Sequence, residues 1–148
     1  MKIRQANLKD LSQIAEIFDK YRQFYNKSSD LPSAIQFLKS RIENSESILF
    51  GAFEGEKVIG FAQLYPCFSS MAMRSSYILN DLYVEPDHRR KSVALALLKV
   101  VKEFARQKQT KSLTLKTEKT NLQAQALYLK DGWQVDEKFV SYNFVFDI

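Results

Sequence analysis

Three apolar, β-rich runs follow one another in the middle of the chain, and this order constrains the fold more than any other feature. They are SILFGAFE at 47–54, KVIGFAQLYP at 57–66 and YILNDLYVEP at 77–86. A tight connection around Gly55 separates the first two, which is typical of a β-hairpin. A doubly wound nucleotide-binding fold does not place three consecutive strands at its centre, so the pattern excludes that architecture.

Helical patterns lie before and after these strands. A short alternating run at 2–6 predicts a first strand, and Asn7 can cap a helix whose apolar positions recur from Leu11 to Tyr25. Asp30, followed by Pro32, opens a second helix. A third amphipathic pattern, carried by Val93, Leu97, Val101 and Phe104, begins after Pro86 has ended the third central strand.

The last third of the chain predicts a strand at 112–117, a helix at 121–132 and a final strand or pair of strands at 133–148. At 148 residues the chain fits one domain, 1–148. We therefore expect an α/β protein with a mixed, mostly antiparallel central sheet of six to seven strands and four helices on both faces.

Composition limits the classes of function. The single cysteine, Cys67, and single histidine, His88, predict neither an intramolecular disulfide nor a metal cluster. No apolar run approaches the roughly 18 residues of a membrane span, and the start of the chain does not resemble a cleaved leader, so we expect a cytoplasmic protein that binds no membrane. A formal charge of +5 favours an acidic partner such as nucleic acid, anionic lipid or a phosphorylated cofactor.

A basic turn, DHRRKS at 87–92, joins the third central strand to the long helix. The first backbone N–H groups of a helix have no partner within the helix and lie at its positive end, where a pyrophosphate can bind. Arg89, Arg90 and Lys91 add positive charge there. An ordinary solvated basic turn would show the same residues.

This turn resembles the acetyl-CoA signature of the GNAT superfamily, written R/Q-x-x-G-x-G/A between a strand and a helix. Arg89 and Ala94 match the pattern, whereas Ser92 stands where the first glycine is usual and Arg90 where many members carry another. A second segment at 120–133 is similar to the family's N-x-x-A-x-x-x-Y-x-x-x-G-[FW] pattern, through Asn121, Ala124, Tyr128, Gly132 and Trp133.

The resemblance implies an N-acetyltransferase in which a primary amine of a small molecule or peptide attacks acetyl-CoA directly. Tyr128 would act as general acid toward the departing thiolate, a role that suits a phenol. The structural alternative is that Asn121 only caps a helix and that Tyr128 only packs with Ala124 and Leu127 on its apolar side. By the same resemblance, the cofactor-binding residues would be Leu82, Tyr83, Val84, Arg89, Arg90, Lys91, Ser92, Val93, Ala94, Asn121 and Tyr128.

The strand YILNDLYV also looks like the matching strand of the diamine and polyamine acetyltransferases, which makes a homodimer an option. That group commonly has an acid where this chain has Asn80, so Asp81 is the candidate base or amine anchor. An ion pair of Asp81 with an arginine is the structural alternative. By the same resemblance, Tyr25 and Tyr65 are expected to line the amine pocket with Asn80 and Asp81, together with Tyr21, Phe24 and Phe68. The alternative is that these aromatic residues only form part of the core.

Two other classes of function stay open on the sequence. The glycine-free turn suits a module that binds acyl-CoA and catalyses little. The cations Lys99, Lys102, Arg106 and Lys108 could bind nucleic acid, but the solvated face of an amphipathic helix explains them better and no base-reading motif occurs, so we expect no nucleic-acid partner.

Overall fold

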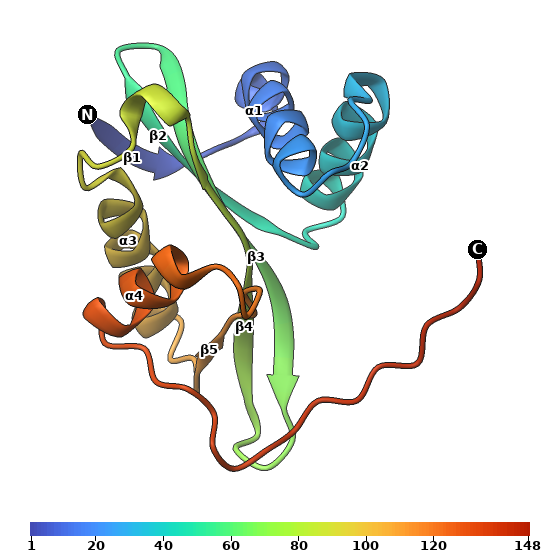
Figure 1. The fold of residues 1–148 in the computed structure, drawn as a ribbon, viewed down its shortest axis with the longest axis vertical. Coiled ribbons are helices and arrows are strands. Elements are labelled where there is room, and N and C mark those ends of the chain that lie inside the picture. The colour runs from blue at the N-terminus through green and yellow to red at the C-terminus, as the bar shows by residue number, and fades with distance from the viewer. The chain divides into compact units, whose positions relative to one another are not determined.

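A computed structural model describes residues 1–148, and the chain divides into two compact units, Met1–Lys116 and Thr117–Ile148, which are described separately (Figure 1). The first unit holds the sheet and three of the four α-helices. Its elements are β1 (Lys2–Gln5), the 3₁₀ turn η1 (Leu8–Asp10), α1 (Leu11–Phe24), α2 (Leu31–Glu43), β2 (Ile48–Glu54), β3 (Lys57–Ser69), β4 (Arg74–Val84), the 3₁₀ turn η2 (Pro86–His88), α3 (Val93–Gln107) and β5 (Leu113–Thr114). The second unit holds α4 (Leu122–Lys130).

The five strands form one mixed sheet in the order β1-β2-β3-β4-β5. Neighbouring strands are antiparallel except β4 and β5, which are parallel. The expected hairpin between β2 and β3 is confirmed, and Gly55 turns it with a φ of +58°, a conformation that glycine adopts without steric cost. The mostly antiparallel character of the sheet is therefore as expected.

Helices cover both faces of this sheet. On one face, α1 and α2 pack over β3, where the rings of Phe18 and Phe61 meet edge to face at 6.2 Å. On the other face lies α3, whose Phe104 ring contacts Phe50 of β2 at 5.5 Å. Alternate residues of the strands thus feed two separate apolar layers, as the two-residue repeat of a strand requires.

Close packing on the α3 side depends on the lack of a side chain at Gly60. A Cβ there would lie 3.0 Å from the Tyr83 carbonyl oxygen and 3.5 Å from Leu97 of α3. A side chain at this position would force the backbone of Tyr83 to move, which costs stability, so this strand position favours glycine.

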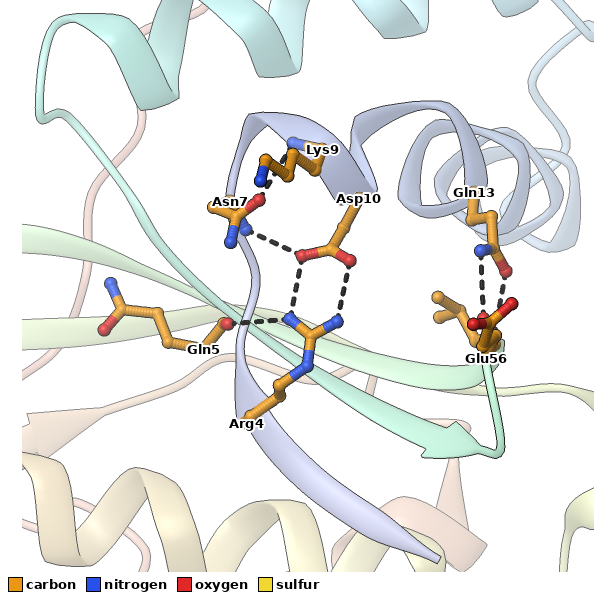
Figure 2. Close-up of polar contacts among 8 residues, drawn as sticks. Arg4, Gln5, Asn7, Lys9, Asp10, Gln13 and Glu56 are labelled. Carbon is orange, nitrogen blue, oxygen red and sulfur yellow. Dashed lines mark hydrogen bonds and ion pairs between the residues drawn. The ribbon is translucent and has the colours of Figure 1, made fainter.

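An ion pair joins β1 to the start of α1 (Figure 2). Both terminal nitrogens of the Arg4 guanidinium donate to Asp10, at 2.9 and 2.8 Å, and the backbone N–H of Asn7 donates to the same carboxylate at 3.0 Å. The Asn7 side chain in turn accepts from the backbone N–H of Lys9, so it is a cap as expected, but of the η1 turn; α1 itself begins after Asp10, which makes no side-chain cap. These contacts lower the pKa of Asp10, the Arg4 hydrogen bonds having the largest effect.

A single amide fixes the other side of α1 to the β2–β3 hairpin (Figure 2). The side chain of Gln13 donates to the Glu56 carbonyl oxygen at 3.0 Å and accepts from the Val58 N–H at 3.1 Å. The amide thereby pairs with one backbone carbonyl and one backbone N–H at the end of the hairpin, as a neighbouring strand would. Asp30 caps α2 as expected, accepting from the Ser33 N–H.

The expected sixth and seventh strands are wrong. No strand occurs at 133–148, and the strand expected at 112–117 is reduced to Leu113–Thr114. The alternating pattern of the C-terminal residues is real, but a strand forms only where a neighbouring strand supplies hydrogen bonds, and the unit Thr117–Ile148 holds no strand of its own to do so. No α-helix has the length and apolar character needed to cross a bilayer.

Asp10→Asn should lower the melting temperature at neutral pH by roughly 2–4 °C, because the ion pair and one strong acceptor are lost. A carboxyl whose pKa is lowered on folding stabilises above its ordinary pKa of 3.8 and loses that stabilisation as pH falls through the lowered value. The difference between variant and parent should therefore shrink in thermal scans below pH 4. Asp30→Asn, which keeps a capping oxygen, is the control, and equal pH dependence in both variants would contradict this assignment.

Candidate active site

A β-bulge in β4 shapes the centre of the first unit. Gln63 of β3 pairs with Asp81 while Leu64 pairs with Leu79, so Asn80 is the extra residue on β4. In a regular strand, neighbouring side chains point to opposite faces, but here Asn80 and Asp81 both line one cavity. The bulge therefore brings two adjacent polar side chains to the same place.

Beyond this region β4 loses its partner on one side. It pairs with β5 only at Tyr77 and Ile78, so the residues from Leu79 to Val84 have no strand on that edge. An unpaired strand edge presents backbone N–H and C=O groups to a ligand or another chain. Of the strand-end residues expected at the cofactor, Tyr83 and Val84 have buried side chains, so Leu82 and the backbone of this edge are what remains to contact a ligand.

Asp81 is a buried carboxylate with neutral partners. Its side chain is 4% exposed, it accepts from Gln63 Nε2 at 2.6 Å and from Asn80 Nδ2 at 3.0 Å, and no arginine or lysine pairs with it. Burial raises the pKa of Asp81, against the smaller opposing effects of its hydrogen bonds to Gln63, Tyr21 and Asn80. The alternative of an Asp81–arginine ion pair is therefore wrong.

The cavity around Asp81, called the Asp81 cavity below, has a volume of about 310 Å³. Burial and the nearby Asp81 charge raise the pKa of Tyr65 to about 12, so its hydroxyl stays protonated near neutral pH. The four expected substrate residues, Tyr25, Tyr65, Asn80 and Asp81, all line this cavity. The full lining is Phe18, Tyr21, Arg22, Tyr25, Lys27, Phe37, Tyr65, Asn80 and Asp81.

Two aromatic residues expected at the cavity lie elsewhere. Phe24 packs against Tyr25 and Tyr83, and Phe68, at 82% exposure, lies far along β3. Sequence reasoning missed Gln63, which is completely buried and holds Asp81. Its position as the one amide within the otherwise apolar run KVIGFAQLYP was the available signal, since a buried polar group needs a partner.

The basic turn before α3 has the left-handed backbone conformation that glycine favours, although it contains no glycine. Arg90 and Ser92, at the two positions where the family pattern favours glycine, both have a φ of +62°. The left-handed conformation is unfavourable for residues with a Cβ, by about 1–2 kcal/mol each, so the surrounding structure must impose it. The Ser92 side chain makes no capping bond, which leaves the first N–H groups of α3 available to an anion.

The cations of this turn have different roles. The Arg89 side chain donates to the Val84 carbonyl oxygen at 2.9 Å and lies over the Tyr83 ring at 5.3 Å, so it holds the turn against the end of β4. Arg90 and Lys91 are exposed and make no ion pair in the chain. They can approach a phosphate together with the uncapped start of α3, near Val93 and Ala94.

The second unit carries the other family motif on α4. Asn121 caps this helix by accepting from the Ala124 N–H at 3.1 Å, and Gly132 ends it with a φ of +95°. Tyr128 lies two turns after Asn121, so both side chains project from the same side of the helix. The ring of Tyr128 contacts Trp133 at 6.1 Å.

Comparison with known proteins identifies the family. The model of the acetyltransferase (GNAT) family matches residues 11–133. The chain belongs to the GNAT acetyltransferase family. It is 48% identical over 142 residues to the uncharacterized N-acetyltransferase YhfO of Bacillus subtilis, covering 96% of this chain and 95% of that protein. A probable acetyltransferase of Haemophilus influenzae is 30% identical over 105 residues, 70% of this chain and 72% of that one.

A crystal structure of a probable acetyltransferase superposes with a TM-score of 0.96 at 36% identity, over 100% of this chain and 99% of that one. The chain is thus a GNAT N-acetyltransferase with the GNAT-like α/β fold. Membership implies acetyl-CoA as acetyl donor and an amine as acceptor. These likenesses do not single out the diamine and polyamine group.

Asp81→Asn should raise the melting temperature at neutral pH by roughly 2–4 °C. The folded state binds the Asp81 proton more tightly than the unfolded chain does, so the parent loses stability as pH rises from 3.8 through the raised pKa. An asparagine escapes this loss, because Gln63 can rotate its amide and accept through Oε1, which has no partner in the parent. Thermal scans from pH 4 to 8 measure the difference.

The gap between Asp81→Asn and the parent should widen as pH rises and close near pH 4. Asp87→Asn, on the exposed η2 turn, is the control and should leave the curve unchanged. A destabilised Asp81→Asn protein at pH 8 would show that the charge is compensated by a partner.

Proposed function

We propose that this protein transfers the acetyl group of acetyl-CoA directly to a primary amine bound in the Asp81 cavity. The observation that carries the proposal is the buried carboxylate of Asp81, which lacks a cationic partner and lies in a cavity with aromatic walls. Carboxylates and aromatic faces both attract an ammonium group. A bound ammonium would supply the missing counter-charge.

The amine must lose a proton before its nitrogen can attack the thioester carbonyl. The new N–C bond then forms as the C–S bond breaks. Burial raises the pKa of Asp81 and so narrows the gap to the pKa of an ammonium, which makes proton transfer to this carboxylate less costly. Asn80 does not act as the base in this proposal, because its amide donates to Asp81 Oδ1 and orients it.

The pyrophosphate of the donor is proposed to bind at the start of α3. Support comes from the uncapped N–H groups there, the left-handed backbone at Arg90 and Ser92, and the unpaired charges of Arg90 and Lys91. A module that only binds acyl-CoA would share these features. What favours catalysis is the additional acceptor cavity with its buried carboxylate.

Tyr128 is proposed to donate a proton to the departing CoA thiolate. The family motif supports this role, as does the common side of α4 that Tyr128 shares with Asn121, the proposed pantetheine ligand. A phenol and a thiol have comparable pKa values, so the transfer costs little. The small Ala124 lies between them along this side of α4 and leaves space for an extended ligand.

Tyr128→Phe should therefore reduce kcat about a hundredfold and leave the dissociation constant of acetyl-CoA nearly unchanged. The hydroxyl acts only as the thiolate leaves, so its loss affects the transition state. Steady-state thiol release and calorimetry with acetyl-CoA measure the two quantities. Tyr142→Phe, in the exposed C-terminal segment, is the matched control, and equal turnover of parent and Tyr128→Phe would remove Tyr128 from the mechanism.

We further propose that the acceptor carries an anionic group besides its amine. Arg22 and Lys27 line the same cavity as Asp81. Arg22 is already close to Asp19 at 3.9 Å and donates to the Ser28 carbonyl oxygen, whereas Lys27 makes no ion pair in the chain. A polyamine would bring a second ammonium toward these cations, while an amino acid would bring a carboxylate.

Lysine and cadaverine separate these possibilities because they differ only by the α-carboxylate. Thiol release with acetyl-CoA, with the product checked by mass, should give lysine a kcat/KM about three- to tenfold higher, the size expected for a partly exposed charge pair. Lys27→Glu should reverse the preference, and Lys99→Glu, on α3 across the sheet, should not. A preference for cadaverine would contradict only the acceptor charge, whereas acetyl-CoA binding without release to any amine would contradict the transferase proposal.

A further inference from the structure

Gln63 of β3 is a buried amide with only one of its two polar atoms paired. Its side chain is completely buried, as are those of its neighbours Ala62 and Leu64. Its Nε2 donates to Asp81 Oδ2 at 2.6 Å, but its Oε1 is also buried and has no hydrogen-bond partner. A buried polar atom without a partner lowers stability, and an apolar side chain at this position would avoid that loss. The amide therefore needs a chemical reason.

The strand register keeps Gln63 in contact with Asp81 without placing it in the cavity. The two residues lie directly opposite each other on β3 and β4, next to the bulge. Asn80, which donates to the other carboxylate oxygen, Oδ1, lines the Asp81 cavity, whereas Gln63 does not. Gln63 can therefore stay bonded to Asp81 while an amine occupies the cavity.

An amide can hydrogen-bond to a carboxyl group in both of its protonation states. An ionised carboxylate only accepts, which suits Nε2, whereas a protonated carboxyl donates, which suits Oε1. A half-turn of the terminal torsion of Gln63 exchanges these two atoms. The separation of 2.6 Å is short for an N–H···O bond and ordinary for an O–H···O bond, so the same spacing serves both. The unpartnered Oε1 is thus the acceptor that a protonated Asp81 would use.

We infer that Gln63 is a positioning residue for the transfer, whose amide donates to ionised Asp81 and rotates to accept from Asp81 once that carboxyl holds the amine's proton. The inference rests on the proposed function, in which Asp81 takes that proton. The ammonium loses one proton to Asp81 Oδ2 and becomes the neutral amine, and the new O–H turns toward Gln63 Oε1. The proton passes to water before the next turnover, and the amide rotates back. Gln63 thus holds the proton away from the cavity while the amine attacks.

Gln63 also has the largest hydrogen-bonding effect on the charge of Asp81. Burial raises the pKa of Asp81, and the bond from Gln63 is the largest of the effects that oppose this rise. The other charged and titratable groups near Asp81 are the same in every variant below, so a change in pH dependence reports Gln63. These groups are Tyr21 and Arg22 of α1, Tyr25 and Lys27 after α1, Tyr65 of β3, and Arg41 of α2, which acts on Tyr65.

Gln63→Met keeps the length of the side chain and removes both hydrogen-bonding atoms. The pKa of Asp81 should rise, because a hydrogen bond to a charged carboxylate is stronger than one to a neutral carboxyl. The acidic limb of the kcat/KM profile, measured by thiol release with the better of lysine and cadaverine, should therefore move up by about one pH unit. Gln13→Met is the matched control, since that amide bonds only to backbone, and its limb should not move. An unmoved limb in Gln63→Met would overturn the inference.

Neutron diffraction from crystals of the parent protein tests the rotation without any turnover. The crystals are exchanged into deuterated buffer at pH values on either side of the pKa of Asp81, as measured by NMR titration. Above that pKa, a deuterated Nε2 of Gln63 should face Asp81 Oδ2, and below it a deuteron on Oδ2 should point to Oε1. Nε2 facing Oδ2 at both pH values would overturn the inference even in an active enzyme. An observed rotation without thiol release from any amine would instead contradict the proposed function.

Discussion

The bulge at Asn80 is the constraint on which the rest of the structure depends. One extra residue in β4 places Asn80 and Asp81 in a single cavity, although adjacent strand residues normally face opposite sides. It lies just beyond the two residues that pair with β5, where β4 begins to run without a neighbour on that edge. One local irregularity thus accompanies both the Asp81 cavity, proposed to bind the amine, and the open edge proposed to receive the donor.

Burying Asp81 without a counter-ion costs stability, and the fold offsets only part of that cost. Gln63 and Asn80 donate to the carboxylate, which favours its charged form, but desolvation dominates and raises its pKa. Such a group is worth keeping at a site that takes up a cationic ligand. The turn before α3 shows a similar compromise, since Arg90 and Ser92 keep a left-handed backbone that glycine would adopt more easily.

Local signals predicted most of the first unit. Capping by Asn7 and Asp30, the Gly55 hairpin and the strand end before Pro86 all follow from short-range physics, and the structure has each of them. The bulge position and the neutral partners of Asp81 depend on strand register, which only the assembled sheet determines.

The C-terminal residues, in contrast, show where a local pattern fails to predict the structure. Their alternation indicates a segment suited to strand pairing, but pairing requires a partner strand that a pattern cannot name. The sequence therefore predicts more strands than the five of the observed sheet. Likewise, Arg22 and Lys27 carry no motif, and only the cavity shows that they share a site with Asp81.

The most direct test of this account is an NMR titration of the Asp81 carboxyl carbon, assigned by comparison with Asp81→Asn, with and without lysine. The account predicts a pKa above the ordinary 3.8 in the free protein and a lower pKa when lysine is bound, because the ammonium then stabilises the charged carboxylate. A pKa at or below 3.8 in the free protein, or one that lysine leaves unchanged, would contradict it.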